Sequence, residues 1–143
     1  SGAYVVYQTL IVTDLERIGD QAADIAEIIL NFEGEHAYRT VEHIPTMAKK
    51  AKMMVHEAID AFIKKDLSTA QMVIKMDDEI DSLFQEVKQE VTEILKENSE
   101  RIDYCIDFLM IAKYLERVGD HAVNICEWLE FNQTGTMNDH RLI

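Results

Sequence analysis

The residues best suited to chemistry in this chain are acidic side chains spaced four positions apart. Glu16 and Asp20 form one such pair, and Glu116 and Asp120 form another. Because four residues make about one helical turn, each pair lies on one face of a helix. Carboxylate oxygens grouped in this way suit hard cations such as iron, manganese, magnesium and calcium, and zinc less selectively. The spacing therefore indicates metal binding.

Both pairs belong to a segment that the chain contains twice. Residues 15–27 recur at 115–127, and eight of the thirteen positions are identical. A match of this quality indicates a duplicated structural unit. Each copy also retains a mid-helix glycine, Gly19 or Gly119, at a cost of about 1 kcal/mol relative to alanine. We interpret the two glycines as positions of close helix packing beside a cation site.

The acidic face extends beyond the first pair in each copy. In the first copy it continues through Asp24 and Glu27. In the second copy it continues to Glu127, while Asn124 replaces the third acid. Like charges one turn apart cost about 0.2–0.5 kcal/mol per pair in an isolated helix. Since both copies retain this penalty, the two acidic faces are predicted to be functional but unequal.

Four long helices are predicted to position these acids. The chain has 143 residues with one proline and five glycines, fewer than a fold of strands and tight turns requires. The fold class is therefore all-α, an antiparallel bundle of four long helices. Ser68, with Gln71 three residues later, fits a capping box at the start of the third helix. The expected helices span residues of about 3–32, 45–65, 69–97 and 100–131.

Apolar rows at helical spacing define the faces expected to be buried. The first row is Ile11, Leu15, Ile18, Ala22, Ile25 and Ile29, and the second is Met47, Ala51, Met54, Ala58 and Phe62. In the third helix Asp77 interrupts the row between Val73 and Ile80, and Asp81 follows one turn later. A buried carboxylate must be neutralised, paired or bound to a cation. The alternative is a tilted row that leaves Asp77 at the solvent edge.

Composition excludes several classes of partner. The formal charge of −13 disfavours nucleic acid and anionic membrane surfaces. No apolar run reaches the length of about 18 residues that a membrane span needs, so direct membrane insertion is not expected. Cys105 and Cys126 follow no zinc or redox spacing. We expect them to be buried free thiols in a reducing cytoplasm.

Enzymatic alternatives have weaker support in the sequence. A di-iron bundle needs Glu-x-x-His on two helices, and the one such pattern, Glu33 to His36, falls in a predicted loop. There is no glycine-rich phosphate loop and no zinc-protease motif. Two further hypotheses remain open beside a simple metal-binding role: a carboxylate-bridged metal enzyme or metal-storage bundle, and an interaction module whose acids contact basic partner surfaces.

The repeated segment resembles the paired signatures of PhoU proteins. The resemblance rests on Leu15-Glu16-Arg17-Ile18-Gly19-Asp20 and Leu115-Glu116-Arg117-Val118-Gly119-Asp120, with Asp77-Asp78-Glu79-Ile80-Asp81 and Asn124-Ile125-Cys126-Glu127 in the same order. It implies two similar three-helix bundles, each with the signature on its third helix. Residues 1–35 would then be the signature helix of a truncated first repeat, 36–132 a complete second repeat, and 133–143 a flexible tail.

The resemblance also implies a function. PhoU proteins are cytoplasmic regulators of phosphate uptake and phosphate-starvation signalling, and they are not established as enzymes. They act with the phosphate ABC transporter, through its ATPase, and with the phosphate sensor histidine kinase. They commonly form homodimers, and several bind multinuclear metal clusters, often of iron or zinc.

Carried over by position, the resemblance implies two metal sites of unequal completeness. The site on the second signature would use Glu116 and Asp120, joined by Asp77, Asp81 and Asp60 from the two preceding helices. The site on the first signature would use Glu16, Asp20 and Asp24. Full-length members have two further helices before this signature, so its partner carboxylates would lie outside the chain. We therefore expect the first helix to pack on the remaining bundle or against another chain, and its site to be empty or completed from outside.

Overall fold

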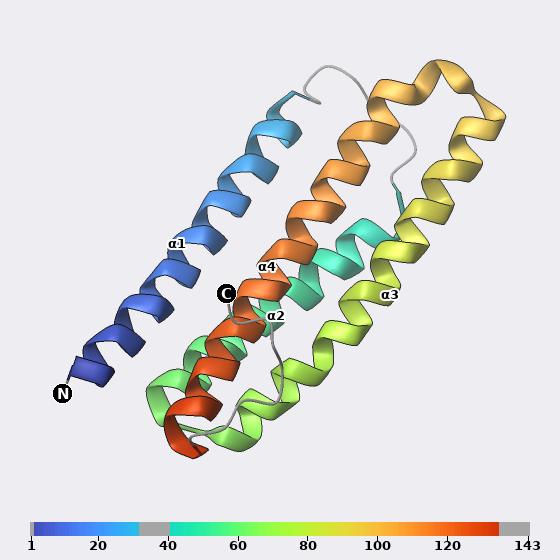
Figure 1. The fold of residues 1–143 in the computed structure, drawn as a ribbon. Coiled ribbons are helices and arrows are strands. Elements are labelled where there is room, and N and C mark those ends of the chain that lie inside the picture. Colours follow the sequence, from blue (N-terminus) through green and yellow to red (C-terminus); the bar gives the residue numbers. More distant parts are fainter. Residues whose placement is uncertain (1, 32–40, 135–143) are drawn as a thin grey trace.

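The structure, a computed structural model, describes residues 2–31 and 41–134 of the chain. Within these residues the fold is all-α, as the sequence predicts, and Figure 1 shows long helices lying side by side. The predicted loop that contains Glu33 and His36 lies outside the described residues, as do residues 135–143 of the predicted tail, whereas residues 133 and 134 belong to the last helix. The helices are α1 (Gly2–Leu30), α2 (His43–Lys64), α3 (Leu67–Glu97) and α4 (Ile102–Thr134), with a 3₁₀ turn, η1 (Ser99–Arg101), before α4.

Helices α2, α3 and α4 form an antiparallel bundle around one hydrophobic core. The predicted apolar rows of α2 and α3 both face this core; Met54, Val73 and Ile80 are completely buried. Asp77 follows the same row and is only 8% exposed. The row of α3 is therefore not tilted toward solvent, and the structure buries a carboxylate between α3 and its neighbours.

The start of α3 differs from the predicted capping box. The N-cap residue is Asp66, whose carboxylate accepts hydrogen bonds from the backbone N–H of Thr69 at 3.1 Å and from its hydroxyl at 2.7 Å. The capping box at Ser68 is therefore wrong, because the helix begins two residues earlier than Thr69 and Ser68 already lies inside its first turn. These bonds are also the main reason that the pKa of Asp66 is lowered.

Replacing Asp66 with alanine is expected to lower the free energy of unfolding by about 1 kcal/mol, because the first turn of α3 loses its side-chain acceptor. Urea denaturation followed by circular dichroism measures this change. Ser68→Ala is the matched control, since Ser68 is exposed and is not the cap. A larger loss for Ser68→Ala than for Asp66→Ala would reverse the assignment.

Helix α1 packs antiparallel along α4, and within the described residues its backbone lies close to no other helix. The row that faces α4 consists of buried and half-buried residues at alternating spacings of four and three: Tyr7, Ile11, Asp14, Ile18, Gln21, Ile25 and Ile28. The predicted row of α1 is therefore only half right. Ile11, Ile18 and Ile25 are in the contact, whereas Leu15, Ala22 and Ile29 are exposed. The expectation that α1 packs on the bundle is met through α4.

The exposed residues of α1 form a second regular row. It consists of Val5, Gln8, Val12, Leu15, Gly19, Ala22, Ala26 and Ile29, and all eight are exposed. At the repeat offset, their counterparts in α4 are Cys105, Phe108, Ala112, Leu115, Gly119, Ala122, Cys126 and Leu129, and all eight are buried. The difference arises because α2 and α3 cover α4, while no described helix covers this side of α1. We call these eight residues of α1 the open row.

The surroundings of the two repeated glycines differ in the same way as the two rows. A Cβ built on Gly119 would meet Met54 Cε at 3.6 Å and Ile80 at 3.7 Å, whereas a Cβ on Gly19 would meet nothing within 4 Å. Close packing is therefore confirmed at Gly119. At Gly19 the interpretation is wrong for this structure, because no described helix is packed against the open row.

Two further sequence expectations have outcomes in the described residues. Cys105 and Cys126 are free and buried, as predicted, and burial raises the pKa of the Cys126 thiol to about 12. Within residues 2–31 and 41–134, no helix combines the length and the apolar character that a membrane span requires.

Candidate functional site

Four of the five acids predicted for the second metal site lie on α3 and α4, which pack against each other. Asp77 is buried, Asp120 is half-buried and Asp81 is exposed. Glu116 is mostly covered, with its side chain 15% exposed, and it accepts a hydrogen bond from Lys113 Nζ at 2.7 Å. The structure therefore brings these acids onto two contacting helices, at different depths, and pairs Glu116 with Lys113.

Two buried glutamates on α4 extend this acidic region. Glu127 is 2% exposed and Glu130 is 3% exposed. Gln71 of α3 donates a hydrogen bond from its Nε2 to Glu130 at 3.3 Å. Sequence analysis placed Glu127 on the acidic face but missed Glu130. The apolar spacing of α4 could have revealed it, since Glu130 is one turn beyond Cys126, which lies in the buried row.

The remaining predicted ligands are more open. Glu16 and Asp20 are exposed on α1, and Asp24 is half-buried. Asp60 of α2 forms an ion pair with Lys64, one turn later on the same helix, at 3.2 Å. Among the described residues, no three histidine, cysteine, aspartate or glutamate side chains are placed to hold a metal ion together. The donor set is still chemically suited to hard cations, because it consists of carboxylates. The metal assignment stays a prediction.

The structure also shows a polar contact in the α1–α4 interface that the sequence analysis did not find. Asp14 is 8% exposed and lies 2.8 Å from His121 Nδ1. Asn124 Nδ2 donates a second hydrogen bond to the same carboxylate oxygen at 3.3 Å. His121 of α4 thus points toward α1. The sequence feature that could have revealed this contact is the position of Asp14 between Ile11 and Ile18 in the row that faces α4.

The sequence of this chain matches a known protein family over most of its length. Residues 44–129 match the family model described as PhoU domain. The chain belongs to the PhoU family. The matched segment contains Asp77, Asp81, Glu116 and Asp120, so it spans the predicted second site and the packed copy of the repeated segment.

Relatives of the PhoU family share this chain's sequence over nearly its whole length. A protein of Clostridium acetobutylicum named phosphate-specific transport system accessory protein PhoU homolog is 40% identical over 129 residues, which cover 90% of this chain and 59% of the relative. A protein of the same name from Zymomonas mobilis is 35% identical, over 89% of this chain and 54% of the relative. The chain thus spans somewhat more than half the length of these relatives.

Solved PhoU structures have the same fold. The crystal structure of PhoU from Pseudomonas aeruginosa superimposes with a TM-score of 0.88 at 29% identity, covering 93% of this chain and 64% of that one. The phosphate transport system regulatory protein PhoU from Streptococcus pneumoniae gives a TM-score of 0.85 at 29% identity, covering 96% of this chain and 65% of that one. These values confirm the all-α PhoU fold that the resemblance implied.

Proposed function

We propose that this chain is a PhoU-type regulator of phosphate uptake and phosphate-starvation signalling that acts by binding partner proteins. The observation that carries the proposal is the PhoU domain match over residues 44–129, which covers α2 from Ile44, all of α3, and α4 as far as Leu129. The names of the relatives, accessory proteins of phosphate-specific transport, support a role beside the transporter. The proposed location is the cytoplasm, and the proposed mode of action is non-enzymatic.

The proposed partners are the ATPase of the phosphate ABC transporter and the phosphate sensor histidine kinase, with a homodimer as the working assembly. The open row of α1 supports a protein-binding role. Apolar side chains such as Val12, Leu15 and Ile29 stay in contact with water there, and burial of such side chains is favourable by about 1.5–3 kcal/mol each. A pull-down of the transporter ATPase with the full chain tests the partner directly.

We further propose that the acids of α3 and α4 bind a metal ion. Glu116 and Asp120 would supply the oxygens of the signature helix, and Asp77 and Asp81 those of α3. Iron, zinc, manganese, magnesium and calcium are all compatible with carboxylate ligands. The buried position of Asp77 supports this proposal, because a cation would offset the cost of burying its charge.

Elemental analysis of the untagged protein tests the metal site. The double variant Glu116→Ala/Asp120→Ala is expected to lose at least about nine-tenths of the bound metal, because both signature ligands are removed. The double variant Glu16→Ala/Asp20→Ala is the matched control. Its acids occupy the same positions in the exposed copy, so metal content should stay near the wild-type value.

The outcomes distinguish the proposed functions. Metal in both the wild type and Glu116→Ala/Asp120→Ala would place the ion elsewhere. Absence of metal from the wild type, together with binding of the ATPase, would leave the acids as a docking face for a basic partner. Hydrolytic or redox turnover that disappears with Glu116→Ala/Asp120→Ala would favour the carboxylate-bridged enzyme instead.

A further inference from the structure

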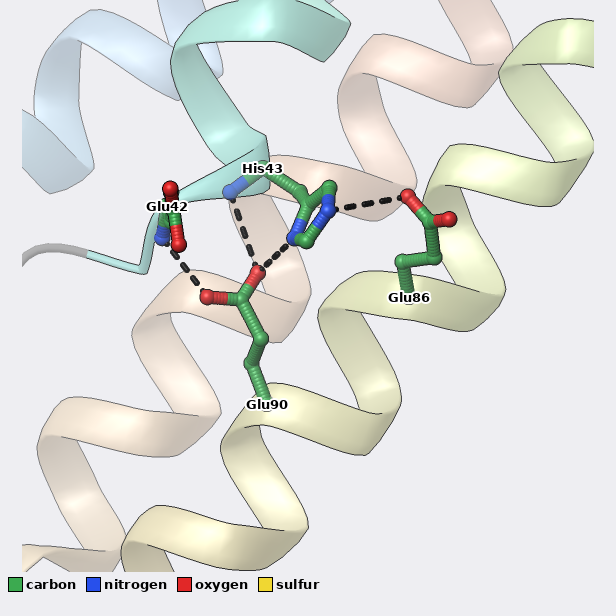
Figure 2. A network of polar contacts seen from close by, with 4 residues as sticks. All are labelled: Glu42, His43, Glu86 and Glu90. Atoms are coloured by element: carbon green, nitrogen blue, oxygen red, sulfur yellow. Dashed lines mark hydrogen bonds and ion pairs between the residues drawn. The ribbon is translucent and has the colours of Figure 1, made fainter.

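A second polar cluster lies at the start of α2, away from the signature acids. Figure 2 shows His43 between two glutamates of α3, with its ring nitrogens directed at Glu86 and Glu90. His43 Nε2 is 3.0 Å from a carboxylate oxygen of Glu86, and Nδ1 contacts Glu90. Glu86 and Glu90 are one helical turn apart, so a single ring spans both carboxylates.

Glu90 also caps α2 from another helix. Its two carboxylate oxygens accept hydrogen bonds from the backbone N–H groups of Glu42 at 2.8 Å and His43 at 3.0 Å. Glu42, the N-cap residue of α2, makes no capping hydrogen bond with its own side chain. The open N–H groups that begin a helix need such acceptors. A residue 47 positions later therefore supplies the cap that the local sequence lacks.

The geometry at His43 depends on a proton. A neutral imidazole has one donor nitrogen and one acceptor nitrogen, whereas the protonated ring donates from both. Since both nitrogens face carboxylate oxygens, both contacts are favourable only when His43 is protonated. A cation at a helix N-terminus is otherwise unfavourable because of the helix dipole, and the two carboxylates of α3 offset this cost.

We propose that His43, Glu86 and Glu90 form a proton-operated latch that fastens the first turn of α2 to α3. With His43 protonated, the ring bridges both glutamates. With His43 neutral, one of its two contacts brings an acceptor nitrogen against a carboxylate oxygen, and that contact opens. The remaining ring contact and the backbone hydrogen bonds to Glu90 then hold the start of α2. This device goes beyond the proposed function, because it depends on neither the signature acids nor any partner.

The charges around the ring set the pH at which the latch opens. The hydrogen bond to Glu90 raises the pKa of His43 above its ordinary value of 6.5, and the negative charges of Glu90, Glu86 and Glu42 act in the same direction. The stabilisation is therefore fully present below about pH 6.5 and is lost as pH rises through the raised pKa. The pKa of Glu90 is lowered despite partial burial, because it accepts hydrogen bonds from His43 and Glu42. Its contribution is lost only as pH falls through that lowered value, well into the acid range.

Thermal unfolding of the full chain at about pH 5.5 and about pH 8 tests the latch. His43→Gln is expected to lower the melting temperature by about 2–4 °C at the lower pH and by less than half as much at the higher pH. His56→Gln is the matched control, since His56 is an exposed histidine of the same helix, and it should change the melting temperature little at either pH.

A ring titration by NMR gives a second measurement that does not depend on unfolding. The midpoint of His43 should lie above 6.5, and Glu86→Gln should lower it, because the variant removes the charge beside Nε2. An equal loss of melting temperature at both pH values in His43→Gln would overturn the proposal. So would a His43 midpoint that Glu86→Gln leaves unchanged.

Discussion

Replacing Gly119 with leucine is expected to lower the free energy of unfolding by about 1–3 kcal/mol, because the added side chain enters a packed core. The Cβ itself fits, since its nearest neighbours, Met54 and Ile80, lie at ordinary contact distances of 3.6 and 3.7 Å. The atoms beyond Cβ have no such room, because both neighbours are completely buried. Urea unfolding at neutral pH measures the change.

The repeat provides a matched control for this variant. Gly19 occupies the same position in the first copy and has nothing within 4 Å of its Cβ site. Gly19→Leu is therefore expected to raise the stability by up to about 1 kcal/mol, through helix propensity alone. Gly119→Ala should likewise be neutral or stabilising. Equal destabilisation by leucine at positions 19 and 119 would show that the open row of α1 is packed against something in solution.

The parts of the fold that sequence analysis predicted correctly are those in which a helix has one apolar face. In α2 the apolar row from Met47 to Phe62 has no second apolar row beside it. In α3 the row that contains Asp77 packs into the core. The row left two positions open for Asp77, the core or the solvent edge of a tilted row, and the structure shows that it is buried. Periodicity predicts these helices well because their other faces are polar.

The prediction for α1 was half wrong because this helix carries two apolar rows. Periodicity identifies both, but it does not show which one meets α4. Ile18 and Leu15 are equally plausible core residues by type, yet Ile18 faces α4 and Leu15 is 37% exposed. Only the positions of α2 and α3, which cover α4 and not α1, decide between the rows.

The polar contacts that the sequence did not reveal join residues far apart in the chain. Glu90 caps α2 across 47 positions, and Asp14 meets His121 across 107. Local patterns such as a capping box report only neighbours within one turn. The cap at Asp66 was missed for a different reason. Ser68 and Gln71 form an equally regular capping pattern two residues later in the sequence, but Asp66 is the residue that caps α3 in the structure.

Replacing Asp14 with alanine is expected to cost about 1–3 kcal/mol, because a charge-assisted hydrogen bond in a mostly buried site is lost. His121 and Asn124 both direct a nitrogen at the same Asp14 oxygen, and both lose that acceptor in the variant. The effect should appear first in α1, whose backbone lies close to α4 alone among the described helices and which meets α2 through the Tyr7–Phe62 ring contact. Urea unfolding measures the total cost, and hydrogen exchange of α1 amides locates it.

Two further variants show how much of this cost comes from the hydrogen bonds to Asp14, from its charge, and from the loss of any acid on α1. Asp14→Asn retains a side-chain oxygen acceptor, so it should cost less than Asp14→Ala. Asp20→Ala removes an exposed acid of the same helix and should change the stability by no more than about 0.5 kcal/mol. If Asp14→Ala leaves α1 exchange as slow as in the wild type, the contact does not hold the two signature helices together. Faster exchange confined to α1 would instead identify Asp14 as a polar anchor between α1 and α4.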